Sequence, residues 1–230
     1  MIILGLDALD LQQTKKYNSK HLMQQECGKT DISDFTQPRT VVLWSSFLTG
    51  KNMEKQIPIK TQWEFQLTPE QTFTNIFDSY KTIDVPAFSH KTSHTKEREL
   101  LKGYFQEKNT IEEFDEIVWK IHEENKKEFL SAIGKHDLVF GYFNLADSIG
   151  HLSFGINEKM ARVYQELEEL AKTIKDSDEF ILTISDHGME AIGRYGDHNQ
   201  NGFYSLNQKK GLHLPKITGF YDLIRSEIQK

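Results

Sequence analysis

The chain has 230 residues, a length that fits one domain with a sizeable hydrophobic core. Hydrophobic residues make up 37% and charged residues 27%, which argues against a disordered or fibrous protein. The formal net charge of −6 argues against binding to a nucleic-acid polymer, but not against a phosphate substrate, because divalent cations can supply local positive charge.

The first strand is expected at Ile2 to Leu6, a continuous apolar run typical of a strand that is buried on both faces. Residues 10 to 37 are polar and lack periodicity, which indicates a variable connection with one short helix at most. Residues 41 to 48 are apolar and are followed by Thr49 and Gly50, which predicts a helix that ends at the glycine.

The middle of the chain gives weaker signals. Thr68-Pro69-Glu70-Gln71 has the residues of a helix start, and we expect that helix to run to about Tyr80. A strand follows over residues 82 to 88, weakened by Pro86. Residues 89 to 109 are polar and basic, and we interpret them as a loop.

The second half shows clearer alternation. A capping box at Thr110 opens a helix whose apolar residues continue to Ile133, with Gly134 at its end. Further elements are expected at 138–143 (strand), 160–174 (helix), 180–184 (strand), 202–206 (short strand) and 217–228 (closing helix).

This alternation predicts an α/β fold, a three-layer sandwich with a mostly parallel central sheet flanked by helices. No repeat or linker divides the chain, so we expect a single catalytic domain over residues 1–230 with a variable segment around 51–136. Cys27 is the only cysteine, and the apolar start of the chain is too short for a signal peptide. No apolar run reaches membrane-spanning length, so we expect a cytoplasmic protein with no membrane association. The sequence does not indicate the oligomeric state.

Potential metal ligands follow three of the predicted strands. The candidates are Asp7, Asp147, His151, Asp186, His187 and, slightly later, His198. Ligands of open α/β sheets bind at the carboxyl ends of the strands, so these side chains are expected at one edge of the sheet. Carboxylate with imidazole suits zinc, iron or manganese, and carboxylate alone suits magnesium. Two ions roughly 4 Å apart can clamp the attacking and leaving oxygens of a displacement at phosphorus.

Each candidate also has an ordinary structural interpretation. Asp7 could be a turn residue, Asp147 and His151 a surface pair four residues apart, and His198 a solvated loop residue. Their shared position at strand ends favours the metal site. We interpret the other histidines as surface residues: His21, His122, His136 and His213. His90 and His94 could reach the mouth of the site, but a structural role is favoured for both.

Three segments, together with Asp7 and His198, resemble the alkaline phosphatase superfamily. They are Thr40 to Gly50, Asp147-Ser148-Ile149-Gly150-His151 and Ser185-Asp186-His187-Gly188-Met189. Within the superfamily the chain is most similar to the type I phosphodiesterase/nucleotide pyrophosphatase group. The resemblance runs from residue 1 to about 206, and residues 51 to 136 contribute no motif to it.

The resemblance implies an alkaline phosphatase-like fold and a catalytic Thr40, which would attack phosphorus and form a phosphothreonine intermediate. It implies that one ion is held by Asp7, Thr40, Asp186 and His187, and the other by Asp147, His151 and His198. It also implies two divalent ions, most often zinc, with manganese or magnesium in some branches. A helix beginning at Thr40 would add backbone donors for the phosphoryl oxygens.

Leu43 departs from the family pattern, since many members have Asn three residues after the nucleophile. Arg39 could replace that contact as a substrate-binding residue. The first interpretation is therefore a phosphodiesterase or nucleotide pyrophosphatase acting on a small phosphate ester. A phosphomonoesterase or phosphomutase on the same metal core is the alternative, with Arg39, Lys51 or Lys91 meeting the extra charge. Sulfatase activity is disfavoured by Thr40, and a non-catalytic metal-binding domain is the alternative of another class.

Overall fold

A six-stranded sheet forms the centre of the protein, seen here in a computed structural model that describes residues 1–91 and 93–229. Its order is β2–β8–β5–β1–β4–β3. The strands are β1 (Ile2–Leu6), β2 (Glu26–Asp31), β3 (Tyr80–Ile83), β4 (Leu138–Phe143), β5 (Ile181–Ser185) and β8 (Asn201–Leu206). β1 pairs in parallel with β4 and β5, and β3 pairs in parallel with β4. β8 lies between β2 and β5 and runs antiparallel to both of them. The predicted mostly parallel sheet is confirmed.

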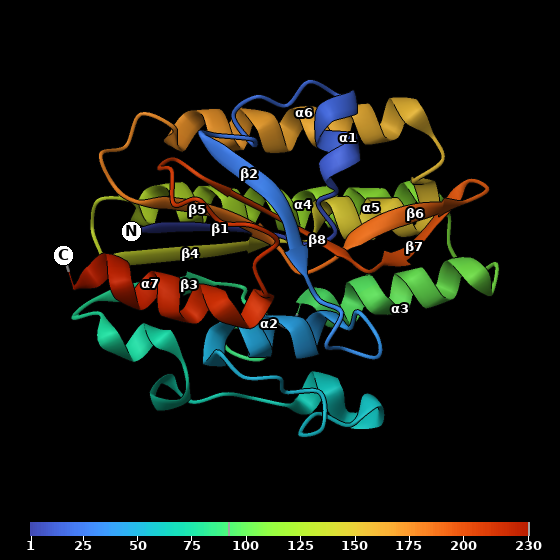
Figure 1. Cartoon of the computed structure of the whole chain (residues 1–230). Helices are drawn as coiled ribbons and strands as arrows, with labels where there is room; N and C mark the ends of the chain where they lie inside the picture. Colours follow the sequence, from blue (N-terminus) through green and yellow to red (C-terminus); the bar gives the residue numbers. More distant parts are fainter. Residues whose placement is uncertain (92, 230) are drawn as a thin grey trace.

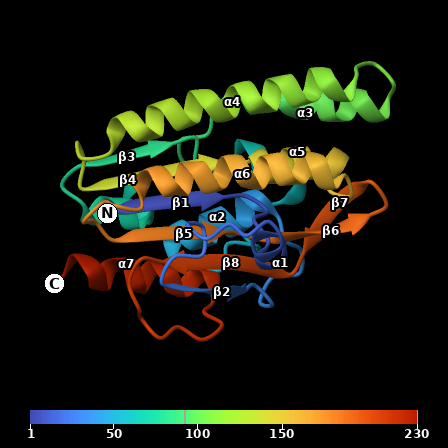
Figure 2. The ribbon, with the colours of Figure 1, turned by 90° about the horizontal axis from the view of Figure 1, so that it is seen from above.

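Helices cover both faces of this sheet (Figures 1 and 2). One face carries α1 (Leu11–Lys16), α4 (Ile111–Ala132), α5 (Leu145–Ser153) and α6 (Asn157–Ile174), with α3 (Ser93–Phe105) packed along α4. The other carries α2 (Thr40–Thr49), α7 (Phe220–Ile228) and the short 3-10 turns η1 (Ile59–Glu64), η2 (Pro69–Gln71), η3 (Phe73–Ile76) and η4 (Ile217–Gly219). The three-layer α/β sandwich is therefore as predicted.

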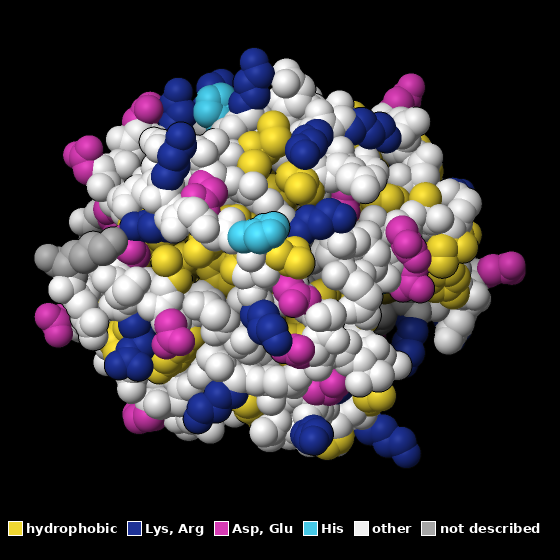
Figure 3. Space-filling model, viewed as in Figure 1, with side chains coloured by type: hydrophobic (Ala, Val, Ile, Leu, Met, Phe, Trp, Pro, Cys, Tyr) yellow, Lys and Arg dark blue, Asp and Glu magenta, His cyan; other side chains and the backbone are white. Residues whose placement is uncertain are grey.

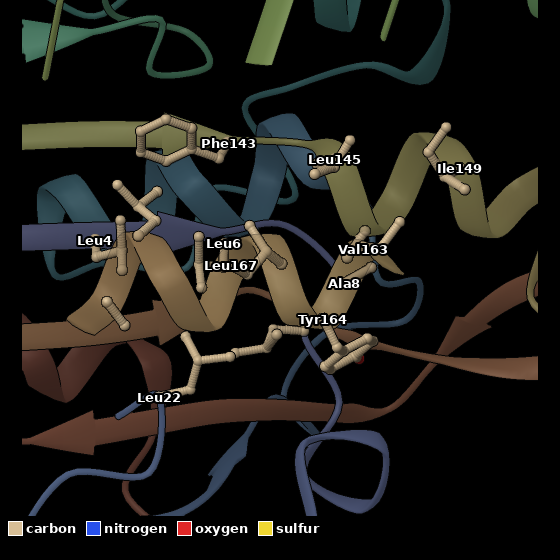
Figure 4. Close-up of a cluster of buried hydrophobic side chains, with 14 of the residues drawn as sticks. Leu4, Leu6, Ala8, Leu22, Phe143, Leu145, Ile149, Val163, Tyr164 and Leu167 are labelled. Atoms are coloured by element: carbon tan, nitrogen blue, oxygen red, sulfur yellow. The ribbon is translucent and has the colours of Figure 1, made fainter. Parts of the chain in front are cut away.

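The core has two halves, one on each face of the sheet, because alternate strand residues point in opposite directions. Leu4 and Phe143 pack with α6 residues such as Leu167 (Figure 4), whereas Ile3 and Phe140 pack against α2 on the opposite face. Gly5 of β1 allows the close approach of α2, since a Cβ there would lie 2.8 Å from Phe140 and 2.9 Å from Trp44. This contact fixes α2 directly over the central strand.

Two helix ends form as the sequence predicts. Gly50 ends α2 with a left-handed φ of 67°. Thr110 and Glu113 form the expected capping box at the start of α4, and Gly134 follows that helix with φ of 75°. The closing helix forms as well, although its first residues, Ile217–Gly219, make a 3-10 turn before α7.

Other expectations for the first half of the chain were wrong. The capping box at Thr68 forms but opens only η2, because Thr72 returns to an extended conformation and caps a second turn, η3, so no helix reaches Tyr80. Residues 10 to 37 contain β2, an edge strand held by its pairing with β8. The strand expected at 82–88 is β3, which ends before Asp84 (φ 61°).

Residues 93–105, expected as part of a loop, form α3, because Leu100, Leu101 and Tyr104 pack against the core. His122 was expected at the surface but is buried, with its Nε2 atom 3.1 Å from Glu166. His21 is half-buried against Glu168, His136 is half-buried and His213 is exposed.

An antiparallel hairpin lies beside the main sheet, formed by β6 (Gly188–Ile192) and β7 (Tyr195–Asn199). It pairs Met189 with His198 and so returns the chain towards the end of β5. On the face of the molecule in Figure 3, basic and acidic side chains are interspersed rather than gathered into one basic patch. None of the described helices is long and apolar enough to cross a membrane.

Candidate metal centre and adjoining cavity

The first cluster of ligand atoms forms where two neighbouring strands end. Asp7 follows β1, and Asp186 and His187 follow β5, which pairs with β1. The Nε2 atom of His187 lies 3.2 Å from Asp7 Oδ1 and 3.4 Å from Asp186 Oδ2. All three side chains are fully buried. The parallel pairing of β1 and β5 thus brings together three ligands that are far apart in the sequence.

The second cluster comes from α5 and the hairpin. Asp147 and His151 are one turn apart on α5, and His198 is on β7. The Nε2 atom of His198 lies 3.1 Å from Asp147 Oδ1 and 3.3 Å from His151 Nε2. Two imidazole nitrogens and a carboxylate oxygen therefore point at one another across a short gap.

The two clusters are contiguous. The rings of His187 and His198 are stacked, with centroids 3.8 Å apart. One set of ligand atoms, from Asp7, Asp186 and His187, lies within 4.8 Å of one another, and so does a set from Asp147, His187 and His198. The six carboxylate and imidazole side chains that were expected to bind metal thus lie together.

The clusters have the properties of cation sites. Asp7 Oδ1, Asp147 Oδ1, both carboxylate oxygens of Asp186 and His187 Nε2 are buried, and none has a hydrogen-bond partner within residues 1–91 and 93–229. Such atoms are costly to bury unless something binds them. Burial and the charge of Asp147 raise the pKa of Asp7 to about 7, and burial and the charge of Asp7 raise that of Asp186 well above its usual value. Divalent cations would remove this repulsion, so the residues fit metal ions.

Hydrogen bonds from outside the clusters orient the ligands. The Tyr142 hydroxyl donates to Asp7 Oδ2 at 2.5 Å. The Nδ1 atoms of His187 and His198 lie 3.0 Å from the Gly188 carbonyl and 2.9 Å from the Pro38 carbonyl. With Nδ1–H donated to a carbonyl, each ring directs Nε2 towards the cluster, which is the atom that could bind a metal ion in its unprotonated form.

Gly150 of α5 and Gly196 of β7 allow α5 to pack against the hairpin. A Cβ added at Gly150 or at Gly196 would overlap the sulfur of Met189. Gly150 lies in the same turn of α5 as His151, and Met189 pairs with His198 across the hairpin. The packing of these glycines against Met189 therefore sets the distance between His151 and His198.

Thr40 is the first residue of α2, and Arg39 is its N-cap. The Thr40 side chain is half-buried, lines a cavity beside the clusters, and makes no hydrogen bond within the described chain. It therefore does not act as a hydrogen-bonding cap of the helix. The Pro38 carbonyl that binds His198 lies two residues earlier, so the start of α2 is connected to the second cluster.

The cations considered from the sequence have other contacts. The Arg39 guanidinium donates to the carbonyls of Ile57 and Glu54, at 2.9 and 3.4 Å. Lys91 Nζ bonds Asn125 and Glu128, both at 2.8 Å. Lys51 lines a different hollow, next to Tyr221.

A cavity of about 200 Å³ opens beside the clusters. Thr40, Asp147, His151 and His198 are among its lining residues. The rest of the lining consists of residues that the sequence analysis did not assign to the site: Trp63, His90, His94, Glu97, Arg98, Leu101, Tyr142, Asn144 and Ser148. Most of them come from η1, the loop after β3, and α3, within the segment from which no motif was recognised.

A buried hydrogen-bond network joins this part of the lining to α5. His94 lies between two carboxylates, with Nε2 2.7 Å from Asp84 and Nδ1 2.8 Å from Glu97. Glu97 also accepts hydrogen bonds from Asn144 and from Ser148, the residue after Asp147. Burial opposes the charge on His94, but the two hydrogen bonds raise its pKa to about 9. The three-residue spacing of His94 and Glu97 could have indicated this pair, had a helix been predicted there.

A family model describes this arrangement. The model of the "Type I phosphodiesterase / nucleotide pyrophosphatase" family matches residues 61–215, which is 155 of the 230 residues. The chain belongs to this family. The match contains five of the six convergent ligands, whereas Asp7 and Thr40 precede it. The family assignment made from the sequence motifs is confirmed.

One solved structure with similarity to this family member is murine ectonucleotide pyrophosphatase/phosphodiesterase 5 (ENPP5, NPP5). The two share 13% sequence identity with a TM-score of 0.48. The similarity covers 84% of this chain and 58% of the murine chain, so this chain spans little more than half the length of that relative. No curated protein matches the sequence.

Proposed function

We propose that this family member is a hydrolase of small phosphate esters, and specifically a phosphodiesterase that uses two divalent metal ions. The observation that carries the proposal is the convergence of six carboxylate and imidazole ligands, three of which line one cavity together with Thr40. Family membership supports the reaction class. The small cavity and the absence of one basic patch on the face in Figure 3 support a small-molecule substrate.

The proposed ligand sets follow the two clusters. Asp7, Asp186, His187 and the Thr40 hydroxyl would hold one ion, and Asp147, His151 and His198 the other. The imidazole ligands favour zinc, with manganese or magnesium as the alternatives. When bound, the ions supply the positive charge that activates the attacking hydroxyl and stabilises the leaving oxygen.

In the proposed reaction the Thr40 oxygen forms a bond to phosphorus as the bond to the leaving alcohol breaks. A water molecule then attacks the phosphothreonine and releases phosphate monoester and free Thr40. The first turn of α2 contributes backbone N–H groups that have no intrahelical partner, next to the attacking oxygen. They would donate hydrogen bonds to a phosphoryl oxygen. In this way they would replace the Asn side chain that many family members have at the position of Leu43.

The contacts of the basic residues favour a diester over a monoester. A monoester carries one more negative charge, which Arg39, Lys51 or Lys91 was expected to meet. Arg39 and Lys91 are occupied by other partners, and Lys51 lines a separate hollow. A phosphodiester needs less positive charge at the phosphoryl group that is cleaved, and none of these three side chains is positioned to supply it there.

The test compares bis(4-nitrophenyl) phosphate with 4-nitrophenyl phosphate, with zinc, manganese or magnesium added to metal-depleted protein. We expect a higher kcat/KM for the diester. Thr40→Ala should lose at least about 10³-fold in kcat while still binding two ions per chain by mass spectrometry. Fewer than two ions per chain in the wild type, or full turnover by Thr40→Ala, would support the non-catalytic metal-binding alternative instead.

A further inference from the structure

The lining of the cavity contains a cation with no hydrogen-bond or ion-pair partner in the described part of the chain. The Arg98 guanidinium lines the cavity, is partly buried, and has no hydrogen-bond or ion-pair partner within the described residues. Its neighbour Glu97 accepts hydrogen bonds from His94, Asn144 and Ser148 instead. A partly buried charge of this kind is unfavourable unless an anion binds to it.

A stack of flat side chains holds Arg98 in place. Its guanidinium carbon lies 4.3 Å from the centre of the Trp63 ring. The Trp63 ring is stacked on His90, with centroids 5.8 Å apart, and His90 on His94, at 4.2 Å. His94 is fixed between Asp84 and Glu97. The guanidinium is therefore oriented by packing on its face, which leaves its N–H groups available at the edge.

We propose that Arg98, supported by Trp63, binds a second anionic group of the substrate, a carboxylate or a phosphate on the substituent that is not cleaved. An arginine fork matches the paired oxygens of either group. This inference rests on the proposed phosphodiesterase function and narrows its substrate class to diesters that carry an additional anionic group. Arg98 contacts neither the scissile phosphoryl group nor the metal ions in this proposal, so it determines specificity.

Matched substrates test the proposal. Propyl 4-nitrophenyl phosphate is compared with its 2-carboxyethyl and 2-phosphonoethyl counterparts, which differ only in the terminal anion and release the same chromophore. We expect the metal-loaded wild type to prefer one of the anionic esters by at least about tenfold in kcat/KM, as one charge-assisted interaction predicts. The better of the two identifies the group. In Arg98→Gln the ratio of kcat/KM for the anionic ester to kcat/KM for the propyl ester should fall towards one. Arg98→Lys should retain part of this preference.

Arg162 provides a matched control, because it stacks on Trp119 at 4.8 Å in a hollow between α4 and α6, away from the cavity. Arg162→Gln should keep the wild-type ratio. A ratio near one in the wild type, or an unchanged ratio in Arg98→Gln, overturns the inference while leaving the phosphodiesterase function standing.

A binding measurement separates the two proposals if no ester is cleaved. Calorimetry with Thr40→Ala should show tighter binding of 2-carboxyethyl or 2-phosphonoethyl phosphate than of propyl phosphate, and the difference should disappear when Arg98→Gln is added. If no ester is cleaved but the anionic phosphates still bind more tightly, only the proposed phosphodiesterase reaction would be rejected. Equal binding of all three ligands would reject the Arg98 subsite.

Discussion

Tyr142 donates its hydroxyl to Asp7 Oδ2 at 2.5 Å, and this bond connects β4 to the ligand at the end of β1. It leaves Asp7 Oδ1 facing His187 and free of other partners. The bond therefore sets both the rotation and the basicity of a carboxylate that is proposed to bind metal.

Tyr142→Phe should weaken the ion held by Asp7. Loss of a hydrogen bond that orients a metal ligand lowers affinity by about 10- to 100-fold, and competition with a chromophoric chelator would measure it. Tyr204→Phe is the control, since it removes a hydroxyl bound to the Leu212 carbonyl, away from the clusters. Equal affinity in the wild type and in Tyr142→Phe would exclude the orienting role.

Asp186→Asn should have opposite effects on the metal-free and metal-loaded protein. Without metal, burial and the charge of Asp7 disfavour the ionised Asp186, so removing that charge should raise the melting temperature. With zinc, the wild type should be the more stable because it gains binding energy that the variant lacks. Calorimetric scans with chelator and with zinc measure both. A variant that is less stable in both conditions would count against a cation site.

His94 should make stability depend on pH. Its folded pKa of about 9 exceeds the usual 6.5, so its contribution is complete below about pH 6.5 and is lost as the pH rises through 9. The full shift corresponds to about 3 kcal/mol. Urea unfolding of the wild type and His94→Asn between pH 6 and 9.5 should show a difference in unfolding free energy that shrinks towards high pH. A difference that does not vary with pH would mean that folding does not raise the pKa of His94.

Gly150→Ala should disturb the second cluster, because the added methyl group overlaps the sulfur of Met189. Overpacking of this kind costs about 1–3 kcal/mol, and the ion held by His151 and His198 should bind more weakly. Adding Met189→Ala should restore ion binding in part, which zinc titration would detect. Gly219→Ala is the control, since a Cβ there meets no atom within 4 Å. If Gly150→Ala has the stability and the zinc affinity of the wild type, then Gly150 has no packing role at this site.

The sequence predicts well which carboxylate and imidazole side chains lie together, because most of the signal is local. Asp7 and Asp186 directly follow apolar strands, and parallel pairing of β1 with β5 then places them side by side. His198 has no such local signal. Its position depends on the β6–β7 hairpin and on the Pro38 carbonyl, so the sequence indicated it only by its place shortly after Asp186 and His187 and by the resemblance to known enzymes.

The rest of the cavity lining could not be predicted in this way. α3 has few apolar residues, so its helical structure depends on the packing of Leu100, Leu101 and Tyr104 against the core. His94 is useful to the site only because Asp84, in a left-handed conformation, faces it from the end of β3. Similarly, β2 forms by pairing with β8 rather than from its own residues. These features arise from tertiary contacts between distant segments.

The two ligand clusters differ in what supports them. Asp7, Asp186 and His187 stand on adjacent strands of the main sheet and are fully buried, whereas His198 is on a separate hairpin and completes its cluster only when that hairpin packs against α5. The first cluster therefore depends on the main sheet alone, and the second depends also on the packing of the hairpin against α5. Of the two proposed ions, we expect the one at the fully buried cluster to exchange more slowly.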